Sequence, residues 1–253
     1  MEFVASPSQP GTSGHHLDAL SSLNPDSGSK KEDTFHLAPP YRPLGAGDET
    51  ILSALSVLRD LQSQGKIRRI GISGYPLPVL LRISLVALHT APFQPLDIIQ
   101  TYAHQTILND SLAQGYLDTL TEKAGVGQLM NAAPLAMGLL TDSGGPLWHP
   151  LRQETGGIFE ATREAAELCR ERGAKLEVVA SEFGFRELRQ KDGKLVPVVI
   201  GCKNMDEVTS TLESHRDANG EVKEVGKEVM AMLEKKGVRG YSWANPHEDT
   251  FRD

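Results

Sequence analysis

The sequence predicts an α/β fold with a parallel sheet, and two observations carry this prediction. Between Asp48 and Arg216, an apolar strand leads four times to a small or polar residue and then to an amphipathic helix. No such unit occurs before Asp48. Helices that join parallel strands pack on the faces of the sheet, so this alternation is typical of a parallel sheet covered by helices.

The composition favours a globular protein that binds small ligands. The 253 residues are 39% hydrophobic, which is enough for a sizeable core. There are 26 basic and 33 acidic residues without a basic stripe, so we expect neither nucleic acid nor a membrane as a partner. No segment resembles a signal peptide or a membrane span, and Cys169 and Cys202 are too few for a disulfide framework or a zinc site. We therefore expect a soluble, cytoplasmic protein without a bound metal ion.

Three regions are expected along the chain. Residues 1–47 are rich in Ser, Pro and Gly and are predicted to be a flexible loop or tail. Residues 48–236 are predicted to fold, and residues 237–253 to form a C-terminal tail. The folded region is expected to start with a helix that Asp48 caps and Gly65 ends.

The four repeated units give the expected positions of the other elements. The strands are predicted at Lys66–Gly74, Asp97–Tyr102, Gln128–Ala133 and Val196–Cys202. Helices are predicted after Pro76, at Leu112–Lys123, from Asn204 to His215, at Phe159–Glu187 with a break at Gly173, and at Glu221–Lys236.

Three segments of the chain read GKIRRIGISGYPLPVLLR, DIIQTYAHQTILNDSL and NAAPLAMGLLTDSGGPLWHP. They resemble the aldo-keto reductase family, in its branch of L-galactose dehydrogenases and fungal D-arabinose 1-dehydrogenases. The last segment is the most specific, and the resemblance covers about Gly65 to Glu213. It implies a (β/α)8 TIM barrel that uses NAD or NADP without a Rossmann fingerprint, and the sequence has no GxGxxG. The four strands would be the fifth to eighth of the barrel, so the implied fold class is a partial, N-terminally truncated TIM barrel.

The same resemblance implies oxidation of an aldose, of D-arabinose or L-galactose type, at C1 to a lactone. The family draws its catalytic Asp, Tyr, Lys and His from the first four strands, and these have no counterpart here. Met1 would lie two positions beyond the His. We therefore assign no catalytic residue and predict no turnover by this chain alone. A start codon assigned too late, or lost upstream coding, is one explanation. The alternative is a non-catalytic half barrel that pairs with itself or with another chain, because open strand edges remain.

Cofactor-binding residues are implied at the carboxyl ends of the strands. Ser73, Gly74 and Gln100 align with groups that hold the nicotinamide carboxamide, although Gly74 replaces the usual Asn. Ala132 replaces an aromatic residue that stacks on the nicotinamide in many relatives. The alternative for Gly74 and Gln100 is that they are strand termini that suit turn geometry.

Two further groups align with phosphate-binding segments. The loop beside the pyrophosphate would contain Ala133, Pro134, Leu135 and Gly138, with core packing as the alternative. The adenosine phosphate would meet the start of a helix at Gly201, Cys202, Lys203 and Asn204. Glu207 lies where NADP-preferring relatives often carry Arg, which favours NAD, and a solvated helix face is the alternative for Lys203 and Glu207.

Two histidines allow a further interpretation. His104 follows Gln100 near the end of a strand and offers a substitute catalytic residue, although a packing role is the simpler expectation. Trp148 and His149 have the chemistry to contact a sugar, and anchoring their loop is the alternative.

Overall fold

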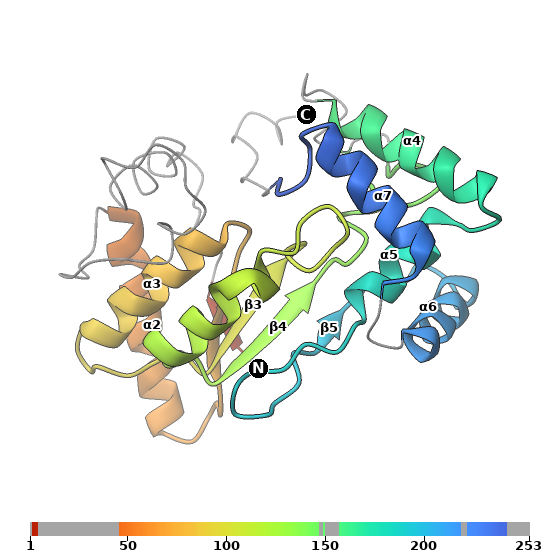
Figure 1. Cartoon of the computed structure of the whole chain (residues 1–253). Coiled ribbons are helices and arrows are strands. Elements are labelled where there is room, and N and C mark those ends of the chain that lie inside the picture. Colours follow the sequence, from red (N-terminus) through yellow and green to blue (C-terminus); the bar gives the residue numbers. More distant parts are fainter. Residues whose placement is uncertain (1, 5–45, 147–148, 150–156, 219–221, 242–253) are drawn as a thin grey trace, which may run out of the picture.

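The computed structural model describes residues 2–4, 46–146, 149, 157–218 and 222–241. At their centre lies a parallel sheet with the strand order β1-β2-β3-β4-β5 (Figure 1). The strands are β1 (Glu2–Val4), β2 (Ile70–Ser73), β3 (Ile98–Tyr102), β4 (Gln128–Ala132) and β5 (Val198–Val199). The parallel pairing confirms the predicted α/β class.

Two strands differ from the prediction. The short strand β1 was not expected, because residues 1–47 were predicted to be a loop or tail, yet Glu2–Val4 pairs with Ile70–Ile72 of β2. Three residues are too few to show the alternation of apolar and polar side chains that is typical of a strand. The strand β1 is therefore evident only from its pairing with β2. The last predicted strand is reduced to two residues, because β5 pairs with β4 alone among the described residues.

Most of the predicted helices are present with slightly different ends. They are α2 (Ala46–Ser63), α3 (Leu77–His89), α4 (Ile158–Glu171), α5 (Leu176–Gly184), α6 (Met205–Asp217) and α7 (Glu224–Lys235). The break between α4 and α5 falls at Gly173, which has a φ of +71°, as predicted. The helix expected at Leu112–Lys123 contains the π-helical segments η2 (Leu112–Tyr116) and η3 (Thr119–Lys123), and it is irregular within η2, where Gly115 adopts a φ of +134°.

Asp48 is not the cap of α2, so this prediction was wrong. The helix begins two residues earlier, at Ala46, and Asp48 lies inside its first turn. The Asp48 carboxylate is buried and pairs with Arg82 of α3. In the sequence, an Asp near the start of a helix resembles a cap. Here the Asp48 side chain is positioned instead by Arg82, which is distant in the sequence.

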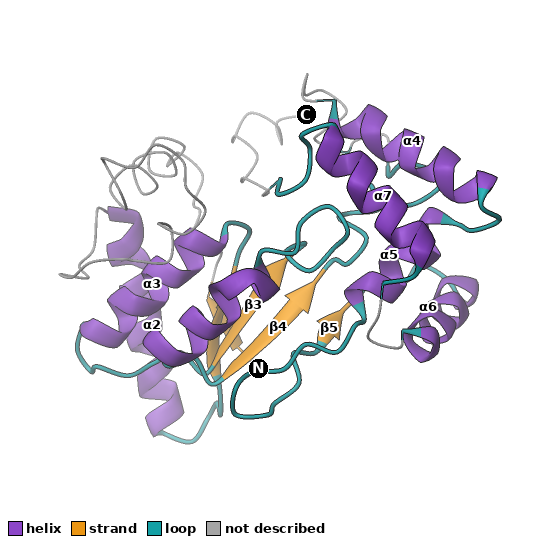
Figure 2. Cartoon of the chain, viewed as in Figure 1, coloured by secondary structure: helices purple, strands orange, loops and turns teal. Residues whose placement is uncertain are grey.

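The two faces of the sheet differ in burial. On one face, Ile72, Ile99 and Leu129 are fully buried in a core that also contains apolar residues of α2, α3, η2 and η3 (Figure 2). Neighbouring side chains in a strand point to opposite faces. The opposite face therefore carries Ser73 and Gln100, both of which are half-buried. One face of the sheet is buried in a core, and the other face keeps partly exposed side chains at the ends of the strands.

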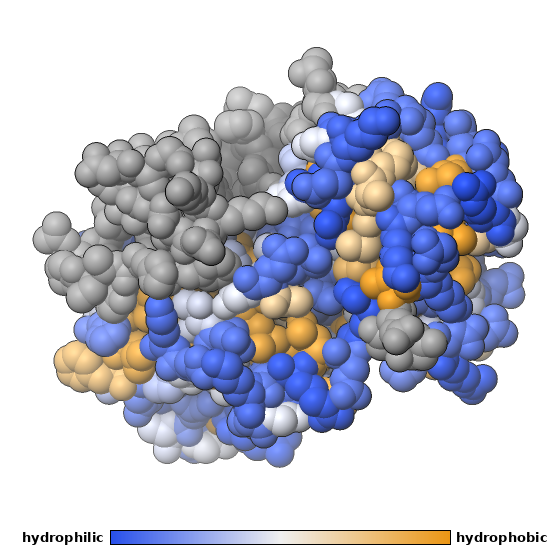
Figure 3. All heavy atoms as spheres, in the orientation of Figure 1, coloured by the Kyte–Doolittle hydropathy of each residue, from blue (hydrophilic) through white to orange (hydrophobic). Residues whose placement is uncertain are grey.

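A second core lies at the carboxyl end of the sheet. It combines α4, α5 and α7 with the loops that follow β3 and β4. Figure 3 shows apolar colour over the α4 and α7 pair and around the visible part of the sheet. Among the described helices, none is both long and apolar enough to cross a membrane.

The first residues after α7 are docked to the fold and do not form a free tail. The Gly240 N–H donates to the Leu108 carbonyl oxygen at 2.8 Å, and Asn109 Nδ2 donates to the Tyr241 carbonyl oxygen at 2.8 Å. Arg239 forms an ion pair with Asp110 at 3.0 Å. These contacts connect the end of the described chain to the loop after β3, which the sequence interpretation of residues 237–253 did not foresee.

Candidate functional site

The carboxyl edge of the sheet brings the residues expected to hold the nicotinamide side by side. Ser73 at the end of β2 is in register with Gln100 of β3. The Gly74 N–H donates to the Gln100 carbonyl oxygen at 3.4 Å, which extends the ladder by one bond. Both side chains lie on the less covered face and are half-buried. A hydroxyl and a carboxamide are thus adjacent at the rim, where they can exchange hydrogen bonds with an amide-bearing ligand.

The loop after β4 continues this edge. The Ala133 N–H donates to the Val199 carbonyl oxygen at 3.1 Å, so the loop starts beside β5. Ala133, Ala136, Met137 and Gly138 all have positive φ angles, which are costly for residues with a Cβ atom. The chain therefore turns sharply back at the rim.

Packing explains much of the same loop. Pro134 and Ala136 are buried and Leu135 packs against the second core, as the core-packing alternative expected. A Cβ atom on Gly138 would lie 3.4 Å from Gly145 Cα, so its φ of +81°, rather than lack of space, requires glycine. Contact of this loop with a pyrophosphate remains a prediction.

The start of α6 is occupied by its own side chains. Asn204 caps the helix, and its Oδ1 accepts the Glu207 N–H at 2.9 Å. The Glu207 carboxylate in turn accepts the Lys203 N–H at 2.7 Å. The Glu207 carboxylate therefore already accepts a backbone N–H that a phosphate at this helix start would use as a donor. Gly201 and Cys202 are exposed beside it, and the Cys202 Sγ lies 3.6 Å from Thr211 Oγ1.

His104 does not have the properties of a catalytic residue. Its side chain is only 1% exposed. Burial lowers its pKa to about 3, and a hydrogen bond with the Tyr102 backbone opposes this shift only in part. The imidazole is thus neutral and enclosed at physiological pH. His104 has the packing role that the sequence interpretation gave as the simpler expectation.

His149 fits the role of a loop anchor. It is buried, and its Nε2 lies 3.4 Å from the Ala136 carbonyl oxygen in the loop after β4. Its backbone N–H also donates to the Pro146 carbonyl oxygen at 3.0 Å. Trp148, its companion in the sugar-binding interpretation, lies outside the described residues.

Sequence reasoning missed an aromatic pair at the same rim. The rings of Tyr75 and Tyr102 meet edge to face, with centroids 4.9 Å apart and an interplanar angle of 87°. Burial, and secondarily Tyr75, raises the pKa of Tyr102 to about 12. The signal was present in the sequence, since each tyrosine follows Ser73 or Gln100 by two positions.

Comparison with known proteins decides the family. The model of the aldo/keto reductase family matches residues 24–237, which is most of the chain. The chain belongs to this family. The match begins inside the segment that was expected to be a tail, and it extends beyond the region of the sequence resemblance, about Gly65 to Glu213. The family generally uses NAD(P)H.

Two curated relatives of this aldo/keto reductase are sugar dehydrogenases. L-Galactose dehydrogenase of Arabidopsis thaliana is 31% identical over 201 residues, which cover 79% of this chain and 58% of the relative. D-Arabinose 1-dehydrogenase of Saccharomyces cerevisiae is 28% identical over 166 residues, which cover 65% of this chain and 47% of the relative. The chain thus spans about half the length of the curated relatives it matches. The match supports an oxidoreductase.

Proposed function

We propose that this chain forms the cofactor-holding part of an NAD(P)-dependent aldose 1-dehydrogenase, with a D-arabinose or L-galactose type of substrate. The observation that carries the proposal is the Ser73 and Gln100 pair at the carboxyl edge of a parallel sheet, on its less covered face. The names of the two relatives support an aldose as substrate, and the name D-arabinose 1-dehydrogenase supports C1 as the site of oxidation. In this account the five strands belong to a partial (β/α)8 barrel, in which β2 to β5 correspond to strands five to eight.

The chemistry of the reaction defines what the chain must supply. Oxidation of the cyclic sugar to a lactone removes a hydride from C1 and a proton from the C1 hydroxyl. NAD or NADP, when bound, takes the hydride, and a base must take the proton. Ser73 and Gln100 would orient the cofactor by hydrogen bonds to its carboxamide.

Among the described residues at this edge, Tyr102 and His104 are the obvious candidates for the base, and neither is suitable. The pKa of Tyr102 is raised to about 12, whereas a tyrosine in proton transfer works best with a lowered pKa. His104 is enclosed in the core. The catalytic Asp, Tyr, Lys and His implied by the resemblance also lack counterparts, so we propose that the 253-residue chain by itself binds cofactor without turnover.

We further propose that NAD is preferred to NADP. Glu207 at the start of α6 would meet the adenosine end of the cofactor, and its carboxylate repels a 2′-phosphate. Asp206 adds a second negative charge in the same turn, against one positive charge from Lys203. The Glu207 carboxylate also accepts the Lys203 N–H, so its negative charge lies at the start of the helix, which likewise favours NAD.

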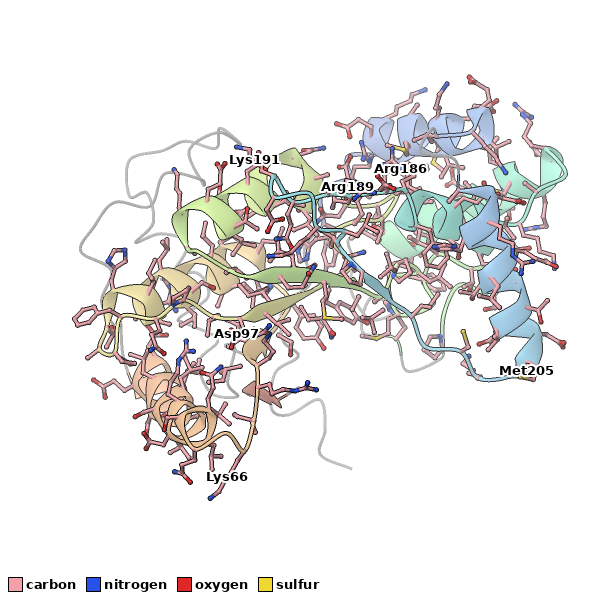
Figure 4. All side chains as sticks on the ribbon, turned by 90° about the horizontal axis from the view of Figure 1, so that it is seen from below. Lys66, Asp97, Arg186, Arg189, Lys191 and Met205 are labelled. Atoms are coloured by element: carbon pink, nitrogen blue, oxygen red, sulfur yellow. The ribbon has the colours of Figure 1, made fainter. Side chains whose placement is uncertain are left out.

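A second candidate function is a non-catalytic half barrel that associates with itself or with another chain. The segment from Leu195 to Leu212, which includes β5 and the start of α6, favours it, because it exposes several large hydrophobic side chains. It holds four of the six such residues in the described part of the chain: Leu195 (49%), Val199 (37%), Met205 (73%) and Leu212 (53%), with Val57 and Phe93 elsewhere. Figure 4 shows Met205 at the outer end of the structure, at the start of α6. An edge strand that exposes apolar side chains is a surface on which another strand can pair.

Two measurements on the purified chain test these proposals. Equilibrium binding of NAD tests the cofactor site, and aldose-dependent formation of NADH tests the absence of turnover. A cytoplasmic location completes the proposal, because both described cysteines are free, as expected in a reducing compartment.

A further inference from the structure

The ends of β2 and β3 form a two-by-two arrangement of side chains. Ser73 and Gln100 are in register and make the lower row. Tyr75 and Tyr102 follow each of them by two residues and make the upper row, held together by their edge-to-face contact at 4.9 Å. Within β3, Gln100 and Tyr102 are two residues apart, so they share a face and lie about 7 Å apart along the strand. Tyr75 lies in the bend after β2, and its ring contact places it beside Tyr102. Two hydrogen-bonding groups therefore lie below two aromatic rings.

The neighbouring strand shows which side chains a ligand can reach. Ala132 of β4 is in register with Tyr102, yet it is only 6% exposed. It offers neither a ring nor accessible surface to a ligand. Tyr75 and Tyr102 are both half-buried, so parts of their rings remain accessible. The accessible aromatic surface in this row thus lies at the end of β3 and in the bend after β2, and not on β4 with Ala132.

We propose that the Tyr75–Tyr102 pair is the aromatic wall of the nicotinamide subsite in this chain and takes the place of the aromatic residue absent at Ala132. The ligand class is a flat aromatic ring with a carboxamide. The ring contacts Tyr102 while the carboxamide bonds to Ser73 and Gln100. The high pKa of Tyr102 keeps its phenol neutral, which suits a contact with a ring that is cationic when oxidised and neutral when reduced. This inference rests on the proposed binding of a dinucleotide.

The same pair also packs against the second core, so a purely structural role must be separated from contact with the ligand. Ligand fragments separate the two. NADH contains the nicotinamide and the adenosine parts, whereas ADP-ribose lacks the nicotinamide. Damage to the fold weakens the binding of both ligands, whereas loss of an aromatic contact weakens the binding of NADH alone.

The test measures the dissociation constants of NADH and ADP-ribose by calorimetry on the full 253-residue chain and two variants. Tyr102→Leu removes the ring, and Tyr102→Phe retains it as a matched control. We expect Tyr102→Leu to weaken NADH by about fivefold while ADP-ribose changes by less than about twofold, in line with the usual strength of aromatic contacts. Tyr102→Phe should bind both ligands like the wild type. In wild-type protein, saturation of tyrosine ring protons should transfer to the nicotinamide protons of NADH.

Three results would overturn the inference. The first is equal weakening of NADH and ADP-ribose by Tyr102→Leu, and the second is no change in either. The third is wild-type NADH binding without saturation transfer from tyrosine, which decides the question even if Tyr102→Leu does not fold. Absence of binding of both ligands to the wild type has a different meaning, because it would remove the proposed function and this inference together.

Discussion

Arg82 of α3 and Asp48 of α2 form a two-pronged ion pair in the covered core. Arg82 Nη2 donates to Asp48 Oδ1 at 2.9 Å, and Nη1 donates to Oδ2. The two side chains are 11% and 8% exposed, respectively. The pair fixes the first turn of α2 against the helix that follows β2. Planar, two-pronged pairing of this kind is the strongest form of ion pair between an arginine and a carboxylate.

Removal of one partner should destabilise the fold. Asp48→Ala leaves the Arg82 guanidinium buried without its counter-charge, so we expect the free energy of unfolding to fall by about 3 kcal/mol. Urea unfolding monitored by circular dichroism measures the change. The double variant Asp48→Leu with Arg82→Met removes both charges and should lose clearly less than Asp48→Ala. The single variants Asp48→Leu and Arg82→Met are measured beside it. A double variant that loses as much stability as these two single variants added together would contradict this view of the pair.

The burial of His104 should make stability depend on pH. Its pKa is about 3 in the folded protein and 6.5 in the unfolded chain, so between these values the unfolded chain binds a proton that the folded chain does not. The free energy of unfolding should therefore fall as the pH drops below about 6.5, by about 1.4 kcal/mol per pH unit from this group. Stability curves at pH 7, 6 and 5 measure the slope.

Substitution identifies the histidine responsible for that slope. His104→Asn should flatten the pH dependence, whatever its effect on stability at pH 7. His89→Asn, at an exposed position on α3, serves as the control and should leave the slope unchanged. Parallel curves for the wild type and His104→Asn would show that the dependence originates elsewhere.

Glu207 should set the preference between the two dinucleotides. Glu207→Arg replaces a carboxylate by a group that binds a 2′-phosphate, so we expect the ratio of NADP to NAD affinity to rise by about tenfold. Competition binding measures this ratio. Glu213→Arg makes the same charge change one and a half turns further along α6 and should have little effect. Equal effects of both substitutions would indicate only long-range charge.

The segment from Leu195 to Leu212 should mediate association if the second candidate function is correct. Sedimentation over a range of concentrations should then show a species larger than the monomer. Met205→Glu combined with Leu212→Glu should convert it to monomer, because charges are costly in an apolar interface. Val57→Glu, at a 58% exposed site on α2, is the matched control and should not. A wild type that is monomeric at every concentration would exclude self-association of the half barrel.

Much of the fold follows from local signals in the sequence. The apolar pattern located four of the strands, and the glycine at position 173 correctly separated α4 from α5. Asn204, with Asp206 and Glu207 behind it, marked the start of α6. These features depend on residues close together in the chain, which a sequence shows directly.

Long-range contacts account for what the sequence did not show. Asp48 has the local pattern of a helix cap, but its partner is Arg82, 34 residues away. The contact of Tyr75 with Tyr102 depends on the register that places Ser73 beside Gln100. The burial of His104, which is 1% exposed, likewise does not follow from its place near a strand end. Spacing within one strand or helix does not specify which elements meet in the fold.

The most direct test of the account uses the purified 253-residue chain with NAD and an aldose. We predict that NAD binds with a measurable dissociation constant, and that addition of D-arabinose or L-galactose produces no absorbance of NADH. Aldose-dependent formation of NADH would contradict the account by showing that the chain holds a complete catalytic site. Failure to bind NAD would contradict it equally, because the Ser73 and Gln100 edge would then have no cofactor to hold.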